Sequence, residues 1–60
     1  MKLIDILLMC SDEMNINVYD NDGELISWHD GKNSIDEELN DRIVTWIYPA
    51  MENQLNIGLA

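Results

Sequence analysis

The apolar positions of residues 1–10 recur with the period of a helix. At about 100° per residue, one side of this helix carries Lys2, Asp5 and Met9. The opposite, apolar side consists of Leu3, Ile4, Ile6, Leu7, Leu8 and Cys10. Two acidic residues follow Ser11. Because acidic residues oppose the macrodipole at a helix C-terminus, we expect the helix to end near Ser11.

The next apolar residues alternate, as they do in a half-buried strand. In residues 14–19, the side chains of Met14, Ile16 and Val18 share one side and face the core. The letters DNDGE come next, and Asn, Asp and Gly tolerate the positive φ angles of tight turns. Residues 24–30 therefore form the returning strand of a hairpin.

A turn and a short helical segment separate this hairpin from the rest of the chain. Gly31 and Asn33 are turn formers. Ser34 and Glu37 have the spacing of a capping box, in which each side chain accepts a hydrogen bond from the other residue's backbone N–H. The pattern predicts a helical turn from Ile35 to about Leu39.

A second hairpin completes the fold. Residues 42–48 have the pattern of a strand that Pro49 ends, residues 50–54 form a turn, and residues 55–60 form the last strand. The apolar face of that strand consists of Leu55, Ile57 and Leu59. The order of elements predicts a single α+β domain, residues 1–60. Its four-stranded antiparallel sheet has the N-terminal helix on one face and the short helical turn between the two hairpins.

The strand at residues 42–48 is apolar on both of its sides. We assign Ile43 and Ile47 to the core, so the other side faces away from the helix. Since one short helix covers one sheet face at most, the second face needs a different cover. The aromatic contact face predicted there consists of Trp28, Val44, Trp46 and Tyr48. Trp and Tyr anchor many protein interfaces, but in a strongly twisted sheet these side chains would fill the core instead.

The charge of the chain narrows the choice of partner. Twelve Asp and Glu oppose three Lys and Arg, giving a net charge of -9, while the 47% hydrophobic content is too high for a disordered acidic tail. Such a surface repels nucleic acid and anionic membranes and attracts the basic surface of another protein. The candidate acidic surface consists of Asp20, Asp22, Glu24, Asp30, Asp36, Glu37, Glu38 and Asp41. These carboxylates could imitate the phosphates of a nucleic acid, or they could serve solubility alone.

Metal and redox chemistry have weak support in the sequence. Counted from Asp20, the sixth and twelfth positions of a calcium loop would be Leu25 and Gly31, where such a loop needs Gly and Glu. The single Cys10 excludes an internal disulfide and is consistent with a reducing compartment. The apolar segment that begins at Leu3 is too short to span a membrane. We expect no metal or cofactor, and a soluble, cytoplasmic protein.

The sequence also contains no catalytic signature. His29 stands beside Asp30, but no second His accompanies them, and Cys10 lies on the predicted buried side of the helix. A chain of this length also has little room for a ligand pocket of about 300 Å³ or more. We therefore expect that the protein is not an enzyme.

The segments KLIDIL, NVYDNDGELI, DRIVTWIYP and NQLNIGL together resemble small acidic proteins of phages and mobile elements of Gram-positive bacteria. The resemblance covers most of the chain and lies in the order of elements, the acidic hairpin turn and the terminal strand. It assigns no functional residue. Some proteins of this kind are anti-defence inhibitors that bind a bacterial immune protein, so the resemblance implies such a role in the host cytoplasm.

Two hypotheses follow from the sequence. The first is a non-enzymatic acidic protein-binding module, a phage-type inhibitor of a host defence or nucleic-acid-handling protein that presents a nucleic-acid-mimicking surface. The second is a small structural or regulatory domain that forms a homodimer through the aromatic sheet face.

Overall fold

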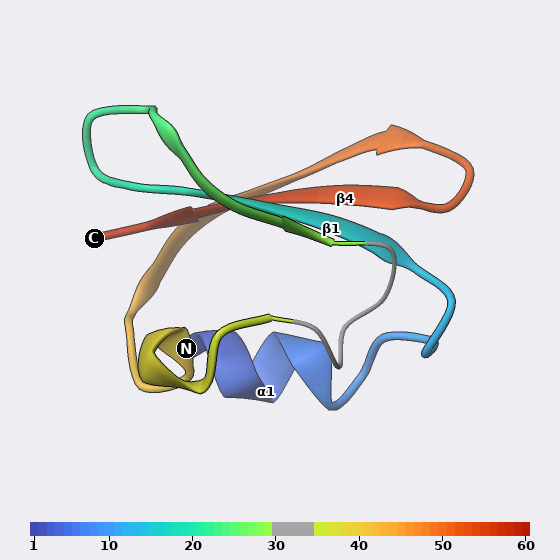
Figure 1. Cartoon of the computed structure of the whole chain (residues 1–60), viewed down its shortest axis with the longest axis horizontal. Coiled ribbons are helices and arrows are strands. Elements are labelled where there is room, and N and C mark those ends of the chain that lie inside the picture. The colour runs from blue at the N-terminus through green and yellow to red at the C-terminus, as the bar shows by residue number, and fades with distance from the viewer. Residues whose placement is uncertain (30–34) are drawn as a thin grey trace.

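The computed structural model describes residues 1–29 and 35–60, and for His29 it describes the backbone alone. The sheet has four strands, and Figure 1 shows the helices below one of its faces. The elements are the helix α1 (Leu3–Leu7), the strands β1 (Asn15–Tyr19) and β2 (Leu25–His29), the 3-10 helix η2 (Glu37–Leu39), and the strands β3 (Val44–Met51) and β4 (Gln54–Leu59). The α+β class is confirmed. None of the helices in residues 1–29 and 35–60 is long and apolar enough to cross a membrane.

The sheet is mixed, and the expectation of a fully antiparallel sheet was wrong. Its strand order is β2-β1-β4-β3. Each hairpin is antiparallel, as expected, but the two hairpins join through their inner strands β1 and β4, which run parallel. In the parallel pair, Ile16 lies beside Leu55 and Val18 beside Ile57. The first and last strands of the chain thus become the centre of the sheet.

The core lies between α1 and the two central strands. Its buried apolar residues are Leu3, Ile6, Leu7, Ile16, Val18, Ile35, Ile57 and Leu59. Cys10, Met14, Leu39, Val44 and Leu55 are partly buried and pack against them. Each fully buried side chain of this size contributes roughly 1.5–3 kcal/mol. The predicted inward faces of the strands at residues 14–19 and 55–60 are therefore confirmed.

The helix α1 is shorter than the sequence predicts. The N–H groups of Met9 and Cys10 donate to the carbonyl oxygens three residues earlier, those of Ile6 and Leu7, at 3.0 and 3.2 Å. This tighter pattern ends the regular helix. Leu8 and Met9 are exposed as a result, so the placement of Leu8 on the buried side was wrong.

The start of α1 is fixed to the segment that leads into β3. The N–H groups of Leu3 and Ile4 donate to the carbonyl oxygens of Arg42 and Asn40 at 2.9 and 3.0 Å. These are first-turn N–H groups that find no acceptor within a helix. The segment before β3 therefore supplies acceptors for the helix and holds it against the sheet.

The helix η2 begins within the segment predicted to be helical, but a different residue caps it. The side chain of Asp36 accepts a hydrogen bond from the N–H of Glu38 at 3.1 Å. The capping box predicted for Ser34, like the turn at Gly31 and Asn33, lies outside the described residues. Asp36 thus has a structural role at the start of η2.

A bulge in β3 decides which side chains face the core. Val44 pairs with Leu59 and Trp46 pairs with Gly58, so Thr45 is an extra residue between the two pairs. Val44 therefore lies on the helix side and packs against the core, and its assignment to the aromatic contact face was wrong.

The assignment of Ile43 and Ile47 to the core needs a related correction. Ile43 precedes the strand and is 50% exposed, so that prediction was wrong. Ile47 pairs with the buried Ile57, but it belongs to an edge strand and is exposed. The strand β3 also continues through Pro49 to Met51, because the missing N–H of a proline is tolerated at a sheet edge.

Candidate partner-binding surface

The sheet face opposite α1 is not covered by any described element, as Figure 1 shows. We call this surface the open face. Strand alternation and the pairing register place ten side-chain positions on it: Asn15, Asn17, Tyr19, Trp28, Trp46, Tyr48, Met51, Gln54, Asn56 and Gly58. Leu25, which pairs with Tyr19 at a bulge, and Ile26 are exposed nearby.

The indole of Trp46 lies over the neighbouring strand β4 because the residue beside it there is a glycine. A Cβ atom built on Gly58 would overlap the indole of Trp46. On the other side of Gly58 lies Tyr19, whose ring centroid is 5.6 Å from that of Trp46 at an interplanar angle of 34°. Such ring pairs contribute about 0.5–1.5 kcal/mol beyond their buried area. Tyr19 and Trp46 therefore form an aromatic pair across β1, β4 and β3.

A second row of residues crosses all four strands. Trp28 pairs with Asn17, Asn17 lies beside Asn56, and Asn56 pairs with Tyr48. The Nδ2 of Asn17 donates to the Oδ1 of Asn56 at 3.0 Å. This bond leaves the Oδ1 of Asn17 and the Nδ2 of Asn56 available to a partner. The row thus has an aromatic residue at each edge of the sheet and a pair of amides between them.

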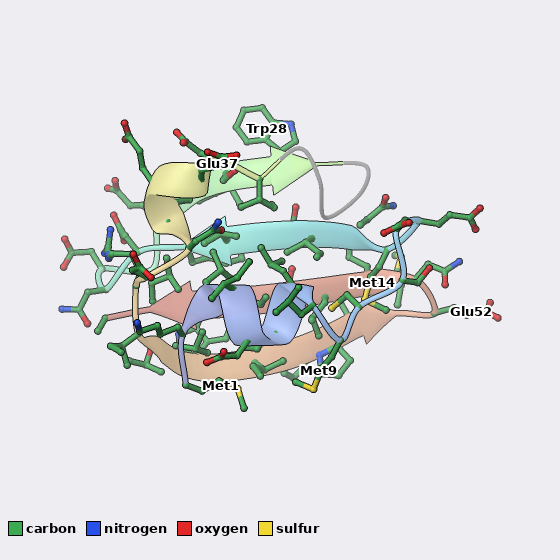
Figure 2. The ribbon with its side chains drawn as sticks, turned by 90° about the horizontal axis from the view of Figure 1, so that it is seen from below. Met1, Met9, Met14, Trp28, Glu37 and Glu52 are labelled. Atoms are coloured by element: carbon green, nitrogen blue, oxygen red, sulfur yellow. The ribbon has the colours of Figure 1, made fainter. Side chains whose placement is uncertain are left out.

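The aromatic residues of the predicted contact face differ in exposure. Trp28 and Tyr48, at the two edges, are 67% and 64% exposed, and Trp46 is 43% exposed. In Figure 2, Trp28 extends past the edge of the sheet at β2. Large exposed aromatic side chains on one face of so small a protein are typical of an interaction surface.

The predicted acidic surface divides into two groups. Asp20, Asp22 and Glu24 lie in the β1–β2 turn, and we call them the turn group. Figure 1 shows this turn on the side of the sheet away from α1, so the turn group borders the open face. The second group surrounds η2, below the sheet, and consists of Asp36, Glu37, Glu38 and Asp41. Asp30 lies outside the described residues.

Asp20 organises the turn group. Its Oδ1 accepts hydrogen bonds from the N–H groups of Asp22 and Glu24, both at 2.9 Å, and its carbonyl oxygen accepts from Gly23 at 3.0 Å. Gly23 has a φ of 83°, which supports the predicted turn. One oxygen of Asp20 is therefore engaged within the turn, while Asp22 and Glu24 are exposed.

The described basic side chains lie near the start of α1 and not on the open face. The Nζ of Lys2 is 3.6 Å from the Oδ1 of Asp41, and the Nη2 of Arg42 donates to the carbonyl oxygen of Ala60 at 2.7 Å. None of the ten open-face positions carries Lys or Arg. In the described part of the chain, the open face therefore has no cation to oppose the turn group.

Other chemistry finds little support in the described residues. Among them, no three His, Cys, Asp or Glu side chains lie close enough together to hold a metal ion. Cys10 is partly buried against the core. His29 and Asp30 were considered above as an acid–base pair. The side chain of His29 and all of Asp30 lie outside the part of the chain that the structure describes.

Sequence reasoning missed the residues that support the aromatic ones. Gly58 and Asn56 alternate with the core residues of the last strand, which indicates that they face outward. Their partnership with Trp46 and Tyr48 depends on the pairing register, which the sequence pattern leaves open.

No protein-family model, curated protein or solved structure matches this chain. The evidence on function comes from the open face and the acidic turn beside it.

Proposed function

We propose that this protein is a non-enzymatic binding module that docks on a basic surface of another protein through the open face. The observation that carries the proposal is the uncovered sheet face, on which Trp28, Trp46 and Tyr48 remain exposed although α1 covers the opposite face. Aromatic side chains of this kind contribute most of the binding energy in many interfaces.

The charge of the chain determines the kind of partner. A net charge of -9 attracts a basic protein and raises its association rate, by about 10-fold to 10³-fold in strongly steered systems. Nucleic-acid-handling proteins present such basic surfaces. The resemblance to small acidic phage proteins supports the same role, an inhibitor that occupies a basic surface of a host defence or nucleic-acid-handling protein in the host cytoplasm.

A homodimer through the same face is the second candidate. The aromatic residues that favour it are those of the open face, but two copies would bring two chains of net charge -9 together. Because the turn group borders the open face, this repulsion would act close to the interface. A basic partner is therefore the better match for this surface.

The experiment is capture from a host lysate with two matched double variants. Trp28→Ser with Tyr48→Ser removes two exposed aromatic residues of the open face. Leu8→Ser with Met9→Ser removes two residues of similar exposure, 71% and 72%, beside α1. We expect the first variant to lose the captured protein and the second to retain it. The captured protein should then be purified and its affinity measured.

Two further measurements complete the design. Affinity for the purified partner should fall at least tenfold in the open-face variant, the equivalent of about 1.4 kcal/mol, and should weaken steeply as salt is raised. Sedimentation of the wild type alone should give the mass of a monomer. The proposal would be contradicted if both variants retained the partner equally. It would also be contradicted if the wild type sedimented as a dimer and the open-face variant, but not the control variant, sedimented as a monomer.

A further inference from the structure

We propose that the open face selects arginine over lysine in its basic partner, with guanidinium groups stacking on Trp28, Tyr48 and Trp46. This inference rests on the proposed function and makes it more specific. The partner is a protein segment rich in arginine, and the recognising surface is the two rows of aromatic and amide side chains across the sheet.

The first support is the charge around the open face. The turn group lies at one end of the sheet, and Glu52 follows β3 in the turn at the other end. Figure 1 shows the two hairpin turns at opposite ends of the sheet. Carboxylates therefore stand at both ends of an aromatic surface. An apolar partner would remove these charges from water without compensation, whereas a cationic one would pair with them.

The second support is the arrangement of aromatic and amide groups. Trp28 and Tyr48 flank the pair Asn17 and Asn56, so each exposed ring stands one strand away from an amide. Neighbouring strands are about 4.8 Å apart, which is close enough for one planar group to stack on a ring and reach the amide beside it. The free Oδ1 of Asn17 is an acceptor at this position.

These features favour arginine for a physical reason. The guanidinium group is planar, carries five N–H donors and is weakly hydrated, so it can stack on an indole and donate to an amide oxygen together. The ammonium group of lysine is a compact, strongly hydrated charge. The carboxylates would attract the ammonium group, but its interaction with exposed rings such as Trp28 would contribute less binding free energy than that of a guanidinium.

The experiment compares two peptides of equal charge, an alternating Gly-Arg peptide and an alternating Gly-Lys peptide of the same length. Affinity for the full chain is measured by calorimetry at about 100 mM NaCl, where surface charges are partly screened. We expect the arginine peptide to bind about fivefold tighter or more. The indole N–H signals of Trp28 and Trp46 in an NMR spectrum should shift with the arginine peptide.

Two variants locate the preference. The double variant Trp28→Leu with Tyr48→Leu removes two exposed rings and keeps both positions apolar. We expect its preference for the arginine peptide to fall to about twofold or less. Leu8→Ser with Met9→Ser changes exposed residues away from the open face and should leave the preference intact.

The outcomes separate this inference from the proposed function. Equal affinity for the two peptides would overturn the arginine inference and leave a basic partner in place. An arginine preference that persists in Trp28→Leu with Tyr48→Leu would overturn the assignment to the stacked rings. If neither peptide binds, the inference is overturned, and the proposed function is then decided by the capture experiment with its own variants.

Discussion

Adding one methyl group at Gly58 should displace the indole of Trp46 from its position over β4. Gly58 is buried in the central strand β4, and the indole of Trp46 fills the space that a side chain would need. In Gly58→Ala the backbone of β4 is held by strands on both sides, so the indole must move. Its movement also breaks the pair with Tyr19.

The cost can be estimated from the exposure of Trp46. The residue is 43% exposed, so more than half of it is covered. Covering roughly 100 Å² of a Trp side chain contributes about 2.5 kcal/mol at most, and the pair with Tyr19 adds about 0.5–1.5 kcal/mol. Alanine recovers about 0.5–1 kcal/mol because it restricts the unfolded chain more than glycine does. Since part of the contact survives in a new rotamer, we expect Gly58→Ala to lower the free energy of unfolding by about 1–3 kcal/mol.

A double-mutant cycle with Trp46→Ala tests the reasoning directly. Without the indole, the three atoms nearest to the new methyl group at position 58 are gone, so Gly58→Ala should be neutral or stabilise by up to about 1 kcal/mol. The coupling energy from urea denaturation should therefore be about 2 kcal/mol. In a Trp28→Phe background, the emission of Trp46 should also shift to the red as the indole becomes more exposed.

Gly23→Ala is the matched control. Gly23 has a φ of 83°, and a Cβ built there meets no atom within 4 Å, so the cost is backbone strain and not overlap. Its effect should be the same with and without Trp46. If Gly58→Ala lowered the free energy of unfolding equally with and without Trp46, within about 0.5 kcal/mol, the packing of the Trp46 indole against Gly58 would be refuted.

Three further predictions concern stability. Asp20→Ala should lower the free energy of unfolding by about 1–2 kcal/mol, because Oδ1 accepts two backbone hydrogen bonds in the turn. Asp22→Ala removes the same charge and should change the free energy of unfolding, measured by urea denaturation, by less than about 0.5 kcal/mol. Equal losses of stability in the two variants would contradict the role of Asp20. Ile57→Val, at a fully buried position, should lower the free energy of unfolding by about 0.5–1.5 kcal/mol. Ile47→Val, at an exposed position, should lower it clearly less. A larger loss for Ile47→Val than for Ile57→Val would contradict the described core. Raising NaCl from about 20 mM to about 0.5 M should raise the melting temperature by about 4 °C or more, because salt screens repulsion within a chain of net charge -9; an unchanged or lower melting temperature would argue against it.

The sequence predicts the parts of the fold that depend on a simple alternation. Ile16 and Val18 in β1, and Ile57 and Leu59 in β4, alternate with polar or small residues and are buried as expected. The direction of pairing between β1 and β4 was not predictable in this way, because a parallel and an antiparallel neighbour require the same alternation. The polar residues of both strands face outward in either arrangement.

The sequence was least informative where both sides of a strand are apolar. In β3, Val44 and Trp46 would share a side if the alternation were regular, but the bulge at Thr45 separates them. The error had no signal in the sequence, because Ile, Val and Trp are all acceptable on a buried face. Trp46 and Tyr48 were nevertheless placed on the side away from the helix.

Gly58 connects the stability of this small domain with its candidate binding surface. Glycine within a central strand is normally unfavourable, since it packs nothing and is costly in entropy. Here it lets a large indole lie on the sheet while 43% of that residue remains exposed to a partner. A larger residue at position 58 would raise the indole or turn it aside, and the row formed with Tyr19 would be lost. The glycine is therefore better explained by the requirements of the open face than by those of the sheet.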